Sequence, residues 1–488
     1  MAVEVKKDLR YSHEIAEILA HATGLRGLSI GRILEGLGDA VLSRNFLEGR
    51  GKSGAGLIVE ACFGIPPNQT PEPDFPNCGV ELKTLPLLRT GAKLRVKERT
   101  SVAMIDYGQL ARESWPTASI RRKLAAILFV FVLMDSDVPA RSELIDSRLW
   151  HPDETDETIF EIDWNRTHDR VVHGEAHKLS EADSWALAAS RKGAGNESDR
   201  VDQPFSDVPA FRRAFTLKPC FTSWVFSELL GKSKSESVIE RILPEVRSRG
   251  FNAAESHIVG RLNELVDLTL RQIFERFEID PGDGKNVAAN IIKRMLGFKN
   301  VNSRIREFDQ LGIEVRVLWL RSRDRIPFEA VSFPTVDLVE LASQEWEESD
   351  LAGQLHRILF VPTYSPDRET LPMDRRMGRA FFWSPSLQEL SVVEREWTML
   401  RDEVAAGRAV YRVGPDGRRN NSLTPASETE MIHMRPHGRN ARDEYLDPLE
   451  NFVTKQCFWL NKSFIGNLVR KHDADGSQGA AAPRQRTL

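Results

Sequence analysis

The sequence predicts a mixed α/β protein of two tandem domains, each with a central mixed sheet flanked by helices. Three observations support this prediction. The chain has 488 residues, more than one hydrophobic core usually holds. Strand-like and helix-like patterns alternate along it, as in mixed α/β cores. Long segments of the first half recur, in the same order, in the second half.

Four segments of the first half have patterns that assign a secondary structure. Gly54–Gly64 has helical spacing and ends in a glycine, a common helix stop. Gly79–Leu85 alternates between apolar and polar residues, which indicates a strand. Ala125–Leu133 is a continuous apolar run that predicts a buried strand, and Phe221–Gly231 predicts another helix.

The repeat is the most informative feature of the sequence. A shift of 233 residues places Gly51–Lys83 on Gly284–Arg316 without a gap. A shift of 231 places Ile127–Val130 on Ile358–Val361. Ala214–Phe221 and Cys457–Phe464 also resemble each other. Because these matches keep their order, they indicate a duplicated domain rather than chance similarity.

The repeat and local composition set the expected boundaries. Residues 1–235 form the first domain, and the polar segment Gly231–Ser237 is interpreted as a linker. Residues 236–472 form the second domain, and residues 473–488 lack apolar periodicity and are expected to be a disordered tail. Within the first domain, Ser190–Gln203 is rich in glycine, serine and charge, which predicts a long mobile loop.

Composition excludes several classes of protein. No run of about eighteen apolar residues occurs and the N-terminus lacks an apolar core, so neither a membrane partner nor a secretory signal is expected. The four cysteines lie far apart with no CxxC pair, which argues against structural zinc and a disulfide scaffold and favours the cytoplasm.

Charge gives a local signal rather than a global one. The net charge is −4, which does not by itself indicate a nucleic-acid partner. Basic residues nevertheless cluster in two places, Arg44, Arg50 and Lys52 in one, and Arg304, Arg306, Arg316, Arg321, Arg323 and Arg325 in the other. Each cluster could neutralise phosphates or be ordinary solvated surface.

A carboxylate and lysine pattern in the first domain points to phosphodiester chemistry. Glu81 and Lys83 lie two apart on the predicted strand, so they point to one side, and Asp74 precedes them by a short turn. Two carboxylates and the Leu82 carbonyl are hard oxygen ligands suited to Mg²⁺, with Glu60 of the preceding helix as a further ligand. Spacing alone favours a solvated strand edge carrying an ion pair over a metal site.

The surroundings of this pattern carry a family resemblance. DFPNCGVELKTLPL (Asp74–Leu87), the stretch Trp115–Phe129 and FTLKPCFTS (Phe215–Ser223) resemble the core of the MutH family of mismatch-repair endonucleases. The two-copy layout, with TKQCFWLNKSFI (Thr454–Ile465), resembles the GATC-cutting type II restriction endonucleases of this family. The resemblance covers the chain to about residue 470 and implies two restriction-endonuclease-like domains of the PD-(D/E)xK superfamily.

The resemblance implies roles for individual residues of the first domain. It places catalysis and metal binding on Asp74, Glu81 and Lys83, a supporting acidic role on Glu60, and a basic contact near the scissile phosphate on Lys123. For Lys123 the ordinary alternative is an exposed lysine at a strand end.

Three further positions concern DNA. Lys192 and Lys218 match positions that approach DNA in the family, although plain surface lysines would explain them equally well. Thr216 stands where the mismatch-repair members sense adenine methylation with a tyrosine. This departure favours restriction over methyl-directed nicking.

The second domain has lost most of the catalytic pattern. At the shift of 233, Asp74 becomes Glu307, Glu60 becomes Lys293 and Lys83 becomes Arg316; at 231, Lys123 becomes Gln354. Only Glu81 persists, as Glu314. A lysine at a ligand position places positive charge where the cation should sit, and arginine is not a conservative replacement for lysine. We therefore expect no cleavage by this domain.

The second domain keeps residues suited to holding DNA. MIHMRPHGRN (Met431–Asn440) resembles the family's base-contacting loop, and Arg435, His437 and Asn440 can donate to or accept from base edges. The alternative is a structural turn made by its proline and glycine. By resemblance, this domain would bind a second recognition site on double-stranded DNA and help activate the first domain.

Three functions are compatible with these patterns. The first is a Mg²⁺-dependent type II restriction endonuclease that cuts double-stranded DNA at GATC, without a small-molecule cofactor. With one working site per chain, either two protomers associate on DNA or one chain cuts the strands in turn. The alternatives are a MutH-type nicking endonuclease of mismatch repair and a DNA-binding protein that does not cleave.

Overall fold

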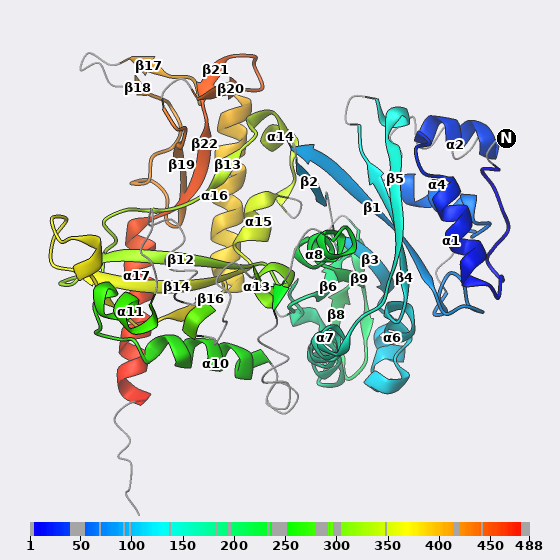
Figure 1. The fold of residues 1–488 in the computed structure, drawn as a ribbon, viewed down its shortest axis with the longest axis horizontal. Helices are drawn as coiled ribbons and strands as arrows, with labels where there is room; N and C mark the ends of the chain where they lie inside the picture. The colour runs from blue at the N-terminus through cyan, green and yellow to red at the C-terminus, as the bar shows by residue number, and fades with distance from the viewer. Residues whose placement is uncertain are drawn as a thin grey trace, which may run out of the picture. The chain divides into compact units, whose positions relative to one another are not determined.

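The computed structural model describes residues 4–39, 54–67, 70–90, 93–96, 99–135, 138–181, 184–193, 197–231, 235–236, 251–278, 291, 293–295, 304–346, 349–413, 419–440 and 443–479. Contacts divide the chain into two compact units, the first mainly residues 1–234 and the second mainly residues 251–308 and 312–488. Figure 1 shows their helices and strands. The segment predicted to link them lies largely outside the described residues.

The main sheet of the first unit is mixed, as predicted. Its order is β2 (Lys93–Val96), β1 (Glu81–Thr90), β4 (Ile127–Leu133) and β5 (Glu143–Trp150). Strands β1 and β4 run parallel, whereas β2 and β5 pair antiparallel with their neighbours. The two central strands bring residues 81–87 beside residues 127–133.

Helices cover both faces of this sheet. On one face α1 (Ile15–Gly24), α2 (Ile30–Leu37) and α4 (Gly54–Cys62) share a buried core with the sheet residues Leu82 and Leu128. On the other face the Phe131 ring of β4 contacts Phe226 of α8 (Pro219–Leu229) edge to face at 4.9 Å. The α7 helix (Glu154–Val172) adds Phe160, which lies 6.3 Å from the Trp150 ring of β5. The predicted helices and buried strands are therefore confirmed.

A second sheet of the first unit corrects one prediction. It has the order β3 (Thr100–Met104), β9 (Arg213–Leu217) and β6 (Leu187–Arg191). The predicted mobile loop Ser190–Gln203 instead contains the end of β6, a 3-10 turn and β7 (Arg200–Gln203), which pairs with β8 (Ser206–Phe211). The remaining helices of this half are α5 (Tyr107–Leu110), α6 (Ser119–Leu124), η1 (Trp115–Thr117), η2 (Pro139–Arg141) and η3 (Ala176–Lys178).

The second unit repeats this arrangement. β12 (Ile313–Arg321) runs parallel to β14 (Arg357–Ser365), which also pairs with the short strands β15 (Arg376–Met377) and β16 (Phe381–Trp383). A second sheet has the order β13 (Val331–Val336), β22 (Gln456–Leu460), β19 (Ile432–Pro436). The other elements of this half are α10 (Phe251–Asn263), α11 (Leu270–Phe277), α13 (Arg306–Gln310), α14 (Leu338–Ser343), α15 (Asp350–Gln354), η7 (Pro372–Asp374), α16 (Leu387–Ala405) and α17 (Lys462–Gly479), with the strand pairs β10 (Ser235–Glu236) and β11 (Arg304–Ile305), β17 (Arg412–Val413) and β18 (Arg419–Asn420), and β20 (Glu444–Leu446) and β21 (Phe452–Thr454).

Strand register and buried acids confirm the duplication. Glu81 pairs with Ile127 in the first unit, and Glu314 pairs with Ile358 in the second. Asp163 of α7 accepts hydrogen bonds from the backbone amides that lead into β6 (2.8, 2.8 and 2.9 Å). Glu396 of α16 does the same for β19 (3.1 and 2.9 Å). An acid at the equivalent place of each unit therefore fixes the equivalent strand.

The C-terminal end of the described chain differs from expectation. The predicted tail begins too early, because α17 continues to Gly479 and Asp473 forms a 2.9 Å ion pair with Arg325. The rest of that tail lies outside the described residues. Among the described residues, no helix combines the length and apolarity that a bilayer crossing requires. The four cysteines are free thiols.

Candidate active site

A buried carboxylate on β1 holds two lysines together. Glu81 is 1% exposed, and its Oε1 lies 2.7 Å from the Lys83 Nζ. Lys123, at the end of α6, donates from Nζ to both carboxylate oxygens at 3.1 Å. Glu81 and Lys83 therefore share one side of the strand, as the alternation predicted. Lys123 is 6% exposed, so the alternative of an exposed lysine is wrong.

The turn before β1 brings Asp74 beside this pair. Phe75 and Val80 form an antiparallel bridge, and Gly79 has a φ of +67°, a left-handed conformation that glycine adopts without strain. The Asp74 Oδ2 accepts from the Leu82 amide at 3.0 Å, and the Asp74 amide donates to the Glu81 Oε2 at 3.2 Å. These two bonds fix both carboxylates relative to the strand.

Glu60 completes the acidic group from α4. Burial raises the pKa of Glu60 to about 7. The positive charge of Lys83 acts against this shift, whereas the negative charge of Asp74 adds to it. Since these charges act on Glu60, its carboxyl group faces the same site, as predicted.

The amine of Lys83 is a cation in this environment. Burial lowers its pKa, but the carboxylates of Glu81 and Asp74 outweigh burial and raise the pKa of Lys83 above its ordinary value. Lys83 can therefore donate hydrogen bonds and offset negative charge, and it is unsuited to act as a neutral base.

The donors available here fit a magnesium ion. Asp74, Glu81 and the Leu82 carbonyl supply hard oxygens, and Mg²⁺ keeps several waters, so it does not require a cage of protein ligands. Within the described ranges, no three Asp, Glu, His or Cys side chains already form such a cage. Both Glu81 oxygens are bonded to Lys123, so an ion would have to compete with that amine.

Comparisons with known proteins agree with this geometry. The family model described as DNA mismatch repair enzyme MutH matches residues 63–163 and 296–396. The first match contains Asp74, Glu81, Lys83 and Lys123, and the second contains their counterparts. The chain therefore contains two regions, in tandem, that match the MutH family model.

Individual relatives match either most of the chain or a little under half of it. The type II restriction enzyme Sau3AI of Staphylococcus aureus is 27% identical over 485 residues, which cover 90% of this chain and 97% of that enzyme. The DNA mismatch repair protein MutH of Shewanella woodyi is 28% identical over 223 residues, 44% of this chain and 93% of that protein. MutH of Vibrio campbellii is 28% identical over 227 residues, 45% of this chain and 96% of that protein.

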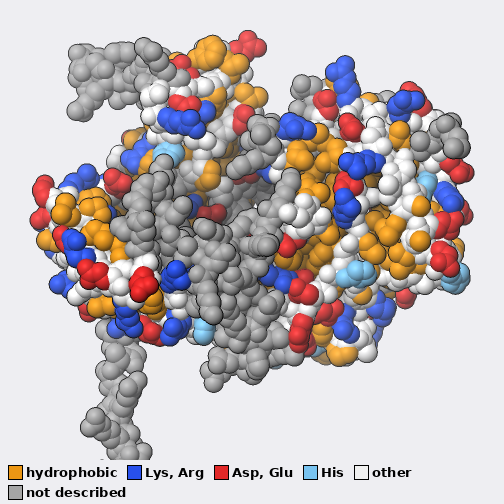
Figure 2. Space-filling view, in the orientation of Figure 1, with side chains coloured by type: hydrophobic (Ala, Val, Ile, Leu, Met, Phe, Trp, Pro, Cys, Tyr) orange, Lys and Arg blue, Asp and Glu red, His pale blue; other side chains and the backbone are white. Residues whose placement is uncertain are grey.

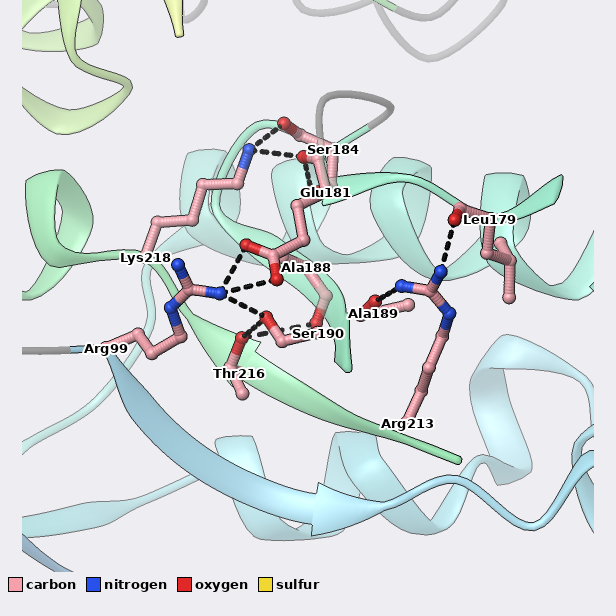
Figure 3. Close-up of polar contacts among 10 residues, drawn as sticks. All are labelled: Arg99, Leu179, Glu181, Ser184, Ala188, Ala189, Ser190, Arg213, Thr216 and Lys218. Atoms are coloured by element: carbon pink, nitrogen blue, oxygen red, sulfur yellow. Dashed lines mark hydrogen bonds and ion pairs between the residues drawn. The ribbon is translucent and has the colours of Figure 1, made fainter. Parts of the chain in front are cut away.

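Two positions of the first unit that sequence analysis connected with DNA, Lys218 and Thr216, lie inside the protein (Figure 3). Lys218 is 8% exposed, and its Nζ donates to the carbonyls of Glu181 (2.8 Å) and Ser184. Burial lowers the pKa of Lys218 to about 8. The alternative of a plain surface lysine is therefore wrong, and a DNA contact would require the amine to leave both carbonyls.

Thr216, at the methyl-sensing position, is also enclosed. It is 0% exposed, and its hydroxyl lies 2.6 Å from that of Ser190 (Figure 3). Arg99 donates to Glu181 at 2.5 Å beside them. In this conformation the threonine cannot touch a base.

Lys192, expected at a loop position, directly follows the last residue of β6. Its amide donates to the Arg212 carbonyl at 2.9 Å, and its side chain is half-buried. In the view of Figure 2, acidic and basic side chains alternate over the described surface of the first unit. The basic cluster Arg44, Arg50 and Lys52 lies outside the described residues.

The second MutH region has a different central pair. Arg316 contacts the Glu314 Oε2 at 3.1 Å, and the Glu314 side chain is 39% exposed, compared with 1% for Glu81. Glu307 is buried, whereas Lys293 and Gln354 are half-buried. Farther along the arginine-rich segment, Arg321 pairs with Asp324 and Arg325 with Asp473, as expected of ordinary surface charge.

The predicted base-contacting loop presents its side chains to solvent. Arg435, His437 and Asn440 are exposed. The guanidinium carbon of Arg435 lies 3.8 Å from the centre of the Trp459 ring, and His437 contacts the same ring edge-on at 5.1 Å. A Cβ on Gly438 would lie only 2.9 Å from Thr454, so the loop is also a tight structural turn. The structure therefore fits both interpretations of the motif, the base-contacting loop and the structural turn.

Sequence reasoning did not identify three cations beside this loop, Arg368, Arg375 and Lys462. They lie on the segment after β14, at the end of η7 and at the start of α17. No spacing in the sequence connects them, because the fold alone brings them together.

Proposed function

We propose that the chain is a type II restriction endonuclease that hydrolyses both strands of double-stranded DNA at GATC. In this proposal residues 1–235 cleave with Mg²⁺, and residues 236–472 bind a second DNA site. The observation that carries it is the group of Asp74, Glu81, Lys83 and Lys123 in one unit only. The likeness to a type II restriction enzyme over nine tenths of the chain supports a site-specific endonuclease.

The residues of the first unit divide the chemistry among them. Asp74, Glu81 and the Leu82 carbonyl would hold the ion, with Glu60 as a further acid. Bound there, Mg²⁺ would supply a water of lowered pKa and polarise the scissile phosphate. Lys83, fixed as a cation by Glu81, would orient the attacking water and stabilise charge on the phosphorus centre. Lys123, released from Glu81, would bind a phosphate oxygen.

The second unit is proposed to bind without cutting. Arg316 replaces Lys83 and pairs with the partly exposed Glu314, so the acidic side chain that persists already has a cationic partner. The exposed Arg435, His437 and Asn440 supply the donors and acceptors for base edges. With one working site per chain, cutting both strands requires association of two protomers on DNA or two successive cuts.

Plasmids with none, one or two GATC sites test this function. We expect linear product from plasmids that carry GATC, and ends that map to that sequence. Open circles as the final product would indicate a nicking enzyme of the mismatch-repair type. DNA that is retarded in a gel but never cut would indicate a binding protein, and equal cutting of the site-free plasmid would exclude GATC specificity.

A further inference from the structure

A pocket in the second unit lies where β12 and β13 meet the loop after β19. Its volume is about 430 Å³, and its lining includes Arg316, Trp319, Glu329, Phe333 and His437. Because Arg316 stands at the position of Lys83, part of this pocket lies at the counterpart of the first unit's candidate site. No part of the proposed chemistry uses it.

Two arginines near this pocket stack on tryptophan rings, one of which, Trp319, lines the pocket. The guanidinium carbon of Arg375 lies 3.6 Å from the centre of the Trp319 ring, and that of Arg435 lies 3.8 Å from the centre of Trp459. The Arg375 Nε is buried and has no hydrogen-bonding partner in the part of the chain that the structure describes. Stacking fixes each guanidinium and leaves its donor edge available to an anion.

Two more cations converge on a single carbonyl next to Trp319. The Phe328 oxygen accepts from the Lys462 Nζ at 2.6 Å and from Arg368 at 2.9 Å. The Phe328 ring lies 4.5 Å from the Trp319 ring, so these cations are close to the stacked Arg375. We call Arg368, Arg375, Arg435 and Lys462 the cationic rim.

One carboxylate opposes this positive charge. Burial lowers the pKa of Arg375, of Arg435 and of Lys462, and Glu329 acts against that shift in all three. For Lys462 the neighbouring Arg368 and Arg435 lower the pKa further. Glu329 thus opposes three of the four cations of the rim, an excess of positive charge that a bound polyanion would relieve.

We propose that the cationic rim binds successive backbone phosphates of the second DNA duplex. This inference rests on the proposed function and names the surface that carries it. The four cations come from separate elements around a pocket, which suits several phosphates better than one small anion. Phosphate contacts position a duplex without reading it. This inference moves Arg435 from the base edges to the phosphates and leaves sequence reading to His437 and Asn440.

The test uses the full chain carrying Lys83→Ala, so that DNA is bound without being cut. Native mass spectrometry counts the short duplexes bound per chain. Fluorescence anisotropy measures the affinity for the second duplex at several salt concentrations. We expect two duplexes per chain. Adding Arg375→Ala and Lys462→Ala should weaken the second site about tenfold or more and reduce its salt slope by about 2, since each phosphate contact contributes about 0.9.

The loss should be equal for duplexes with and without GATC. Arg401→Ala is the matched control, because Arg401 also stacks on a tryptophan of this unit, at 5.4 Å from Trp397, but outside the rim. Two duplexes bound by the double variant, with an unchanged salt slope, would overturn the rim assignment and leave the proposed function standing. A single duplex bound by the Lys83→Ala chain itself would remove the second DNA site and the proposed function's division of roles.

Discussion

Glu81 is a buried carboxylate whose charge is balanced by two ammonium groups before any ion is bound. An isolated buried carboxylate would be costly, so Lys123 stabilises the site in the absence of metal. In the proposed mechanism, the same contact would be broken when Glu81 becomes a metal ligand. Lys123 would then link metal entry to the release of a cation beside the scissile phosphate.

This link predicts the behaviour of Lys123→Met, which keeps the stem and removes the charge. The affinity for Mn²⁺, measured by isothermal titration calorimetry, should rise by at least about tenfold. The reason is that the Lys123 ammonium and the Glu81 carboxylate, 3.1 Å apart, attract each other by several kcal/mol at an effective dielectric constant of ~20, and the ion no longer has to overcome this attraction. Cleavage should fall. If the variant binds Mn²⁺ no more tightly than the parent, Lys123 does not compete with the ion.

The pair Lys83 and Arg316 tests the division between the two units. Lys83→Ala should reduce the single-turnover cleavage rate by about 10²–10³-fold or more, the loss typical for one stabilising donor. Arg316→Ala should leave that rate largely intact at saturating DNA. Strand scission that survives Lys83→Ala but is lost in Arg316→Ala, with binding unchanged, would assign catalysis to the other unit.

The raised pKa of Glu60 gives stability a pH dependence. The unfolded carboxyl ionises near its ordinary pKa of 4.5, whereas the folded one stays protonated until about 7. The folded state therefore holds more protons between these values, and stability falls as pH rises through that window. Glu60→Gln should remove this decline, so it should stabilise the metal-free protein more at pH 8 than at pH 5 in urea unfolding.

At the scale of elements, the two units can be distinguished by their buried acids. Asp163→Asn and Glu396→Gln each remove a charge that accepts backbone hydrogen bonds at the start of a strand. Each should destabilise its own unit by about 2–3 kcal/mol, the range for hydrogen bonds to charged groups. Differential scanning calorimetry should show that each variant shifts a different transition. A shift of the same transition by both would mean that the units unfold as one.

The sequence predicted the elements whose patterns are local. Alternation placed Glu81 and Lys83 on one side of β1, and the apolar run of residues 125–133 predicted β4. The β7–β8 hairpin was missed because its turn has Phe205 at a φ of +62°, where a glycine would have signalled the turn. Burial of Lys218 was also missed, since its partners are carbonyls from a distant segment.

The sequence predicted those residues of the candidate site that lie on or next to one strand, or that the family resemblance indicated. Asp74, Glu81 and Lys83 lie within ten residues, so spacing could suggest them. Lys123 came from resemblance, and its bond to Glu81 depends on the pairing of β1 with β4. The cationic rim required the tertiary fold of the second unit, because no single element carries more than one of its members.

For the whole molecule, duplication followed by divergence gives two units with the same strand register and different centres. Glu81 pairs opposite Ile127 and Glu314 opposite Ile358, so the backbone that positions the site is kept in both. The charged groups at this position differ. In the first unit two lysines contact the buried Glu81, whereas in the second unit Arg316 contacts the partly exposed Glu314. The second unit keeps two acids at these positions, Glu307 and Glu314, but has Lys293 in place of Glu60, which supports the proposal that it binds DNA without cutting.

The proposed second DNA site predicts activation by a second duplex. Cleavage of a plasmid with one GATC should accelerate several-fold when a short duplex containing GATC is added, because that duplex fills the second unit without competing for the plasmid at low concentration. A duplex of equal length without GATC is the control and should have a much smaller effect, since base contacts are needed for specific binding. The measurement is the initial rate of linear product against duplex concentration. A rate that only falls with added GATC duplex would mean that both duplexes compete for one site, and that the second unit has no DNA-dependent role in cleavage.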